Sequence, residues 1–310
     1  MTQAEQYVHQ PVMLEEVLEL LPTRTNGFYV DGTFGRGGHS RALLARLSGE
    51  GRLAGIDRDP LAVAAGEALA TEDARFTIHA GRFDCLAEVV AQVGRPLDGV
   101  LLDLGVSSPQ LDDPARGFSF LRDGPLDMRM DPTSGESAAA WLARAEQEDI
   151  ANVLYRYGEE RRSRAIARRI CETRTAQPIT TTRQLASLIE SVLGRGQPGK
   201  HPATRSFQAI RIHINQELAA LEAVLDQALE CLAPGGRLVV ISFHSLEDRL
   251  VKLFMRDAAG RTPQPRGLPV QAPAARMHLL GKARLAGEQE VAVNARARSA
   301  VLRAAEKVAA

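Results

Sequence analysis

The chain has 310 residues, of which 45% are hydrophobic and 25% charged, the composition of an ordinary globular protein that can bury a sizeable core. The formal net charge is zero, and no stretch reaches the apolar length of a membrane span. The first twenty residues carry four glutamates instead of a signal peptide pattern, and three widely spaced cysteines form no C-x-x-C pair, which predicts a cytosolic protein with reduced thiols.

Charge is unevenly distributed along the chain although the total is zero. Residues 249–310 hold twelve Lys and Arg against four Asp and Glu, and residues 156–174 hold seven Arg against three Glu. Basic surfaces of this kind can follow a nucleic-acid backbone. Arginines on a helix are also commonly a solvated face paired with glutamates, so charge alone leaves a nucleic-acid partner open.

The first part of the chain alternates between strand and helix patterns. After an amphipathic helix that opens at Pro11, apolar runs predict strands at 28–31, 52–57, 76–80 and 98–104, with helices at 38–47, 60–70 and 84–93. Such alternation is typical of a parallel sheet with helices on both faces, so we expect an α/β fold.

A glycine-rich turn follows the first of these strands. Asp31 ends the strand, four glycines fall within residues 32–38, and a helical pattern then begins. Glycines at a strand-to-helix turn let a ligand approach the main chain closely. The second strand ends in Asp57, about twenty residues after Gly37, which is the spacing expected of an acid that binds ribose hydroxyls. The order of these features predicts a nucleotide-type site.

The position of Asp31 bears on which ligand this site takes. A dehydrogenase places a pyrophosphate at the start of the helix, where an acid would repel it. An acid there suits a cation, and S-adenosylmethionine carries a ribose at one end and a sulfonium at the other. A nicotinamide dehydrogenase is therefore a weaker alternative, and a simple glycine turn with a solvated Asp31 is another.

The alternation breaks after Gly105. Residues 106–136 are rich in Pro, Gly, Asp and Ser, and long ordered loops of this kind tend to be functional. Residues 137–193 show helical patterns throughout, and a Gly/Pro loop follows at 194–202. One long helix is expected over 204–232, a strand over 237–243, irregular structure over 257–290, and a last strand at 300–304 that closes the sheet edge. The expected domains are a core over 1–136, a helical insertion over 137–200 and the rest of the core over 201–310.

Ligands of an open parallel sheet gather beyond the carboxyl ends of its strands, which singles out several more residues. Phe83 could cover a base, although ordinary core packing is nearly as common for such a residue. Asp103 ends an apolar strand, where an ionised acid is costly without a partner. The other candidates are polar residues that otherwise read as turn or helix-capping residues, namely Ser107, Ser108, Gln110 and His244.

Six sequence blocks resemble a known family when they are taken together. They are DGTFGRGGHS at 31–40, LDLGVSSPQ at 102–110, RGFSF at 116–120 with GPLDMRM at 124–130, YGEE at 157–160, HPATR at 201–205 and SFHSLEDR at 242–249. The resemblance is to the bacterial 16S ribosomal RNA cytosine-N4 methyltransferases of the RsmH or MraW type, and it covers nearly the whole chain.

The resemblance implies a class I, Rossmann-like methyltransferase sheet with a small all-helical insertion. It implies methyl transfer from S-adenosylmethionine to N4 of a decoding-region (P-site) cytidine in 16S rRNA of the small ribosomal subunit. By motif position, the family's cofactor contacts fall on Gly37, Gly38, His39, Asp57, Phe83, Asp103 and Gln110. Thr33 departs from the wider D-x-G-x-G-x-G pattern, and no aromatic residue follows Pro109, so base stacking there cannot be carried over.

The chemistry of the acceptor suggests which residues act on it. Cytosine N4 has a delocalised lone pair, so hydrogen-bond acceptors aimed at its N–H groups would help the transfer, and no metal is needed. We expect Asp103, oxygens of Ser107 and Ser108, and His244 in that role. The segment 116–129 could close over the flipped base, and the basic clusters would hold rRNA phosphates.

Two other classes of function stay open at this stage. One is a non-catalytic rRNA-binding assembly factor, and the other is a methyltransferase acting on a protein or small molecule. The sequence also leaves open whether the protein is a monomer or a homodimer.

Overall fold

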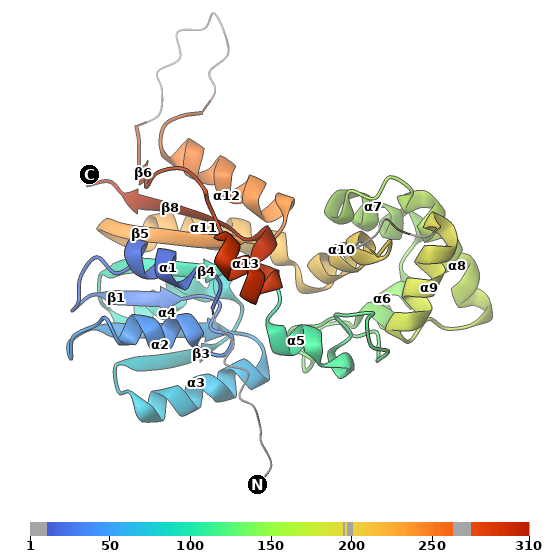
Figure 1. Cartoon of the computed structure of the whole chain (residues 1–310), viewed down its shortest axis with the longest axis horizontal. Helices are drawn as coiled ribbons and strands as arrows, with labels where there is room; N and C mark the ends of the chain where they lie inside the picture. Colours follow the sequence, from blue (N-terminus) through green and yellow to red (C-terminus); the bar gives the residue numbers. More distant parts are fainter. Residues whose placement is uncertain (1–10, 195, 197–200, 263–273, 310) are drawn as a thin grey trace, which may run out of the picture. The chain divides into compact units, whose positions relative to one another are not determined.

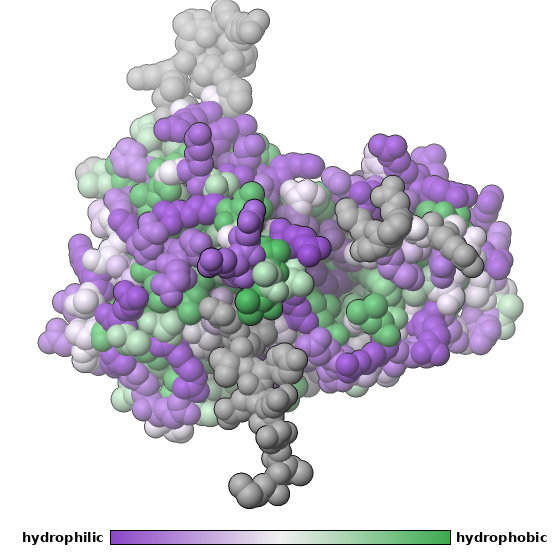
Figure 2. All heavy atoms as spheres, viewed as in Figure 1, coloured by the Kyte–Doolittle hydropathy of each residue, from purple (hydrophilic) through white to green (hydrophobic). Residues whose placement is uncertain are grey.

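The structure is a computed structural model that describes residues 11–194, 196, 201–262 and 274–309 (Figure 1). The chain folds into two compact units, one formed by Met1–Gly105 with Ala219–Ala310 and the other by Val106–Leu218. Hydrophilic side chains cover much of the face seen in Figure 2. Within the described ranges, no helix combines the length and the apolar character that crossing a bilayer requires.

The first unit is built on one eight-stranded sheet with the order β3-β2-β1-β4-β5-β8-β6, and β7 pairs with β8. Neighbouring strands from β3 to β5 are parallel, whereas β8 runs antiparallel to β5, β6 and β7. The strands are β1 (Phe28–Asp31), β2 (Arg52–Asp57), β3 (Phe76–Ala80), β4 (Leu97–Asp103), β5 (Leu232–Ser242), β6 (Met277–Leu279), β7 (Arg284–Leu285) and β8 (Val301–Lys307).

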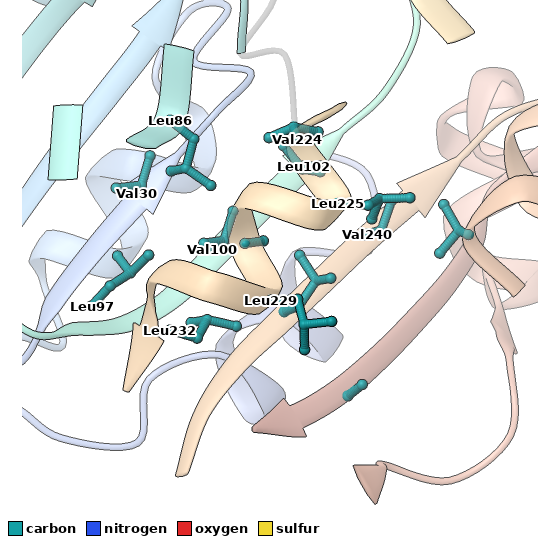
Figure 3. Close-up of a cluster of buried hydrophobic side chains, with 14 of the residues drawn as sticks. Val30, Leu86, Leu97, Val100, Leu102, Val224, Leu225, Leu229, Leu232 and Val240 are labelled. Carbon is teal, nitrogen blue, oxygen red and sulfur yellow. The ribbon is translucent and has the colours of Figure 1, made fainter. Parts of the chain in front are cut away.

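Both faces of this sheet are buried, which explains why its central strands read as continuous apolar runs. Val100 and Leu102 lie in the cluster of Figure 3, with side chains of α4, α11 and α12. Leu101 points to the opposite face and packs with side chains of α1, α2 and α3. The helices are α1 (Leu14–Leu20), α2 (Gly38–Leu44), α3 (Pro60–Glu72), α4 (Leu86–Val93), α11 (Glu217–Cys231), α12 (Ser245–Ala258) and α13 (Glu288–Val293), with 3₁₀ turns η1 (Phe83–Cys85) and η3 (Ala295–Ser299).

The expected α/β fold with a parallel sheet and a helical insertion is confirmed, and three expected elements are wrong. The helix expected over 204–232 is two helices, because Gln216 takes a left-handed conformation with φ of 52°. The stretch 257–290 holds β6, β7 and the start of α13 in its described part, although residues 263–273 lie outside the description. β8 lies between β5 and β6 and not at the sheet edge.

The second unit is helical and wider than the insertion expected at 137–200. Its core joins Phe118, Leu126 and Met128 of the connecting segment to side chains of five helices. This burial explains why the boundary lies at Val106 and not at 137, and why residues 204–215 belong to the same unit. Its elements are α5 (Ser108–Asp112), η2 (Pro114–Arg116), α6 (Ala138–Arg144), α7 (Gln147–Gly158), α8 (Ser163–Ala176), α9 (Thr182–Leu193) and α10 (Thr204–Asn215). Most of the predicted loop at 194–202 lies outside the described residues.

Candidate functional site

The strand order reverses at β1, which pairs with β2 on one side and with β4 on the other. Open α/β sheets bind their ligands beyond the carboxyl ends of the strands at such a reversal. Asp31 ends β1 and Asp103 ends β4, with Asp31 opposite Leu101 in the pairing register. The fold therefore places two carboxylates at the edge where a ligand is expected.

Asp31 is almost completely buried, with 1% of its surface exposed. The Ser40 hydroxyl donates a hydrogen bond to its Oδ2 at 2.7 Å, and the Thr33 N–H donates to its Oδ1 at 3.2 Å. Loss of hydration outweighs these donors and raises the pKa of Asp31 to about 6. A carboxylate held this way gains from a positively charged ligand more than an exposed one would.

The raised pKa of Asp31 predicts how the ligand-free protein responds to pH. Because the folded state holds the proton more tightly than the unfolded chain, the stabilising contribution of Asp31 is lost as pH rises from about 4 to about 6. We expect Asp31→Asn to gain stability over the wild type between pH 4.5 and pH 7.5, by about 2 kcal/mol. Urea unfolding at the two pH values measures this difference.

Asp73 provides a control of opposite sign for that experiment. The Arg75 guanidinium holds the pKa of Asp73 at about 2, so its contribution is present at neutral pH and is lost in acid. Asp73→Asn should therefore lose stability at pH 7.5. A stability difference between Asp31→Asn and wild type that does not change with pH would contradict the assignment.

The structure of the turn after β1 explains why it contains glycines and why Thr33 stands where the wider methyltransferase pattern has a glycine. A Cβ on Gly32 would lie 2.7 Å from Leu102 Cδ2, and Gly37 has a φ of 76° that favours glycine. Thr33 uses its hydroxyl, because Oγ1 accepts a hydrogen bond from the Asp103 N–H at 2.6 Å. A glycine could not make this contact between the turn and the end of β4.

Asp57 ends β2 and is oriented by the same turn. Its Oδ2 accepts from the Gly35 N–H at 2.8 Å, and its Oδ1 accepts from the Asp59 N–H at 2.9 Å. Burial is the largest influence and raises the pKa of Asp57. Each carboxylate oxygen has a second lone pair, so an oriented Asp57 can still accept hydrogen bonds from two hydroxyl groups.

Asp103 has a buried oxygen with an unmet hydrogen-bonding capacity. Its Oδ1 has no hydrogen-bond partner among the residues that the structure describes. Burial, followed by the negative charges of Asp31 and Glu247, raises the pKa of Asp103 well above its usual range. Ser242 Oγ, at the end of the neighbouring strand β5, is likewise buried and without a partner in the described part of the chain. Unsatisfied buried polar atoms at a strand edge indicate a place for a ligand.

His39 and Phe83 flank these acids. His39 Nε2 lies 3.0 Å from the Val12 carbonyl oxygen and therefore carries a proton, while Nδ1 lies 3.8 Å from Asp103 Oδ2. Phe83 opens η1, and its Cβ lies 3.5 Å from the position that a Cβ on Gly32 would take. The structure therefore places the first-unit residues predicted to bind the cofactor at or directly after the carboxyl ends of the strands, and their role stays a prediction: Gly37, Gly38, His39, Asp57, Phe83 and Asp103.

His244 acts as the N-cap of α12. Its Nδ1 accepts from the Glu247 N–H at 3.4 Å, its Nε2 lies 3.0 Å from Glu247 Oε1, and Glu247 Oε2 accepts from the N–H groups of Phe243 and His244. Both ring nitrogens thus face groups in the first turn of α12. This is the capping alternative anticipated for His244, and its catalytic role stays a prediction.

Ser107, Ser108 and Gln110 belong to the second unit, where they form the start of α5. Ser107 and Gln110 make a capping box in which Gln110 Oε1 accepts from the Ser107 N–H at 2.9 Å. Gln110 is 6% exposed, so this local role fixes its side chain. Their predicted roles toward cofactor and base stay predictions.

Several residues of the site were not identified from the sequence as functional. Ser40 donates to Asp31, Thr33 accepts from the Asp103 N–H, and the charge of Glu247 acts on Asp103. Ser242 contributes a buried hydroxyl at the end of β5. For Glu247 a local signal existed, because a glutamate three residues after a capping position often closes a capping box. For Thr33 and Ser40 the contacts depend on how the turn and α2 pack against the strand ends, which no local pattern reports.

Known proteins resemble this chain over nearly its whole length. The model of the MraW methylase family matches residues 6–308. The chain belongs to the MraW methylase family. It is 70% identical to the ribosomal RNA small subunit methyltransferase H of Alcanivorax borkumensis, with 99% of each chain covered. It is 58% identical to the protein of that name from Chromohalobacter salexigens, with 98% of this chain and 93% of the relative covered. The resemblance identified from the sequence blocks is thus confirmed.

Proposed function

We propose that the protein transfers a methyl group from S-adenosylmethionine to the exocyclic N4 of a decoding-region (P-site) cytidine in 16S rRNA of the small ribosomal subunit, in the cytoplasm. Support for a small-subunit rRNA substrate comes from the names of relatives that are 58% and 70% identical over nearly the whole chain. Support for the chemistry comes from the buried Asp103 Oδ1, which has no partner among the described residues. The proposal depends mainly on this buried oxygen and its lack of a partner in the described part of the chain.

The residues present fit S-adenosylmethionine. Asp57 accepts from the ribose hydroxyls, Phe83 covers one face of the adenine, and Gly37 and Gly38 allow close approach to the main chain. Asp31 supplies the negative charge that favours a sulfonium, and burial strengthens that attraction. When bound, the cofactor supplies an electrophilic methyl group, so the chain has only to position the acceptor and receive its charge.

Asp103 is the residue that we assign to the acceptor amine. An N–H of cytosine N4 donates to its carboxylate, which localises the nitrogen lone pair and stabilises the positive charge that develops there. The raised pKa makes Asp103 a stronger acceptor and a better base than an exposed aspartate. Ser107, Ser108 and His244 are proposed for the same amine with less support, because Ser107 and His244 already take part in capping.

Incubation with labelled S-adenosylmethionine tests the proposal directly. Small subunits and naked 16S rRNA from cells lacking this protein serve as substrates, and nucleoside mass spectrometry follows. We expect N4-methylcytidine at one position of the rRNA. Binding of the cofactor without methylation of any RNA would indicate a non-catalytic assembly factor, and label in protein or small molecules would indicate a different substrate.

A further inference from the structure

A cavity of about 300 Å³ lies between α8 and α9, and all of its lining residues belong to the second unit. The two α8 residues on its wall are four positions apart, and the α9 residues are spaced by three and four, so each set shares one helix face. These residues are Arg169 and Thr173 of α8 and Gln184, Ser187 and Ser191 of α9, and Gln177, directly after the end of α8, also lines the cavity. Two helix faces therefore form a groove, which we call the α8–α9 groove.

The side chains that line the α8–α9 groove favour one kind of ligand. Its lining holds one cation, Arg169, no carboxylate, and several hydroxyl and amide groups, with Ile179 and Leu188 as apolar surface. Such a lining suits a ligand that joins one negative charge to an uncharged ring with hydrogen-bonding edges. A nucleotide has that composition, and the cavity volume lies at the small end of the range for ligand pockets. An acidic peptide would need more cations than this wall provides.

The charges of Arg168 and Arg169 on α8 are poorly compensated. Arg168 and Arg169 share Glu172 at 3.9 Å, which is longer than a direct charge-assisted hydrogen bond. In the C-terminal region, by contrast, arginines make short ion pairs with acids of the first unit. The pairs are Arg276–Glu230, Arg284–Glu19 and Arg303–Asp248, with nitrogen-to-oxygen distances of 2.6–2.8 Å. The charges of Arg168 and Arg169 are thus less compensated than those of these three arginines and can still attract a phosphate.

We propose that the α8–α9 groove binds one nucleotide of single-stranded RNA, with Arg169 at its phosphate and the polar side chains of α9 at its base. This inference rests on the proposed rRNA substrate for the identity of the RNA. It assigns the helical unit a second contact with the substrate strand, through residues that the methyl-transfer site does not use.

Filling the groove tests the proposal. Ser187 and Ser191 are exposed and lie one helical turn apart on α9, so Ser187→Trp and Ser191→Trp fill the cavity without entering the core. Thr175→Trp, on α8, exposed, uncharged and outside the groove lining, is the control. With a labelled 12-nucleotide polyuridine RNA as probe, we expect each groove variant to raise the Kd about tenfold and the control to leave it unchanged.

Arg169 and Arg168 form a matched pair for the phosphate contact, since both are exposed, adjacent and near Glu172. Arg169→Glu should weaken polyuridine binding about tenfold more than Arg168→Glu, and it should lower the slope of log Kd against log salt by about 0.7. Equal effects of the two changes would mean a diffuse basic surface and would overturn the proposal. The proposal would also be overturned if the wild type did not bind polyuridine, or if it bound polyuridine and no groove variant weakened that binding. Groove-dependent binding of uridine monophosphate without binding of the RNA would overturn it as well.

Failure of the groove proposal can be distinguished from failure of the proposed methyl transfer. S-adenosylmethionine binding and methylation of small subunits by the wild type test the methyl-transfer site alone. Groove variants that bind the cofactor normally but bind RNA weakly support the groove, whatever nucleotide the wild type methylates.

Discussion

Asp57→Asn is expected to weaken S-adenosylmethionine binding by about 10- to 100-fold. The change removes the charge from the carboxylate proposed to accept from the ribose hydroxyls, and hydrogen bonds to charged groups are worth about 1.5–3 kcal/mol. It also places an amide nitrogen against one of two backbone N–H groups, those of Gly35 or Asp59, that now donate to Asp57. Isothermal titration calorimetry measures the dissociation constant.

Asp59→Asn is the matched control, because it removes one carboxylate charge two residues away. Asp59 caps α3 by accepting from the Leu61 N–H at 3.0 Å, and asparagine is an equally good cap. The control should stay within about threefold of the wild type. If the two variants bound the cofactor equally, Asp57 would have no specific role and the ribose assignment would be wrong.

The sheet could be predicted from sequence because its signals are local. Central strands are buried on both faces and read as short apolar runs, and glycines or acids mark where they end. The first four strands were placed to within a residue for that reason. The acids Asp31, Asp57 and Asp103 were found by the same logic, since each directly follows such a run.

Elements that depend on tertiary contacts were not predictable in the same way. Gln216 takes a left-handed conformation that the sequence does not signal, because glycine or asparagine is the usual residue there. The short strands β6 and β7 exist through pairing with β8 and have too few residues for a periodic pattern. The segment 106–136 shows no helix or strand period, so the burial of Phe118, Leu126 and Met128 was hidden.

The electrostatics of the site illustrate the same limit. The sequence places Asp103 at a strand end, but its raised pKa arises from burial and from Asp31 and Glu247, which are distant in the chain. The Thr33 contact to the Asp103 N–H spans seventy residues. Residue types and spacing therefore identify a site, whereas the chemistry of each group depends on neighbours that only the fold supplies.

Asp103→Asn is expected to lower turnover by about 10²- to 10³-fold while changing cofactor affinity much less. The carboxylate is proposed to stabilise charge on the acceptor amine, and loss of one such group from a preorganised site typically has an effect of this size. Asparagine keeps the shape and one acceptor oxygen but loses the charge. Asp98→Asn, at the opposite end of β4, is the control, since asparagine can still accept from the Phe28 N–H that Asp98 binds at 2.9 Å.

The pH profile provides a second test of Asp103, independent of any loss of folding. Because the pKa of Asp103 is raised, the fraction of ionised carboxylate falls as pH decreases through a value above that of an ordinary aspartate. Wild-type turnover at saturating S-adenosylmethionine should therefore decline on the acid side at that raised value, and Asp103→Asn should lack this decline. Saturation removes the effect of Asp31 on cofactor binding. An acid limb that is identical in wild type and variant would assign the amine contact to another residue.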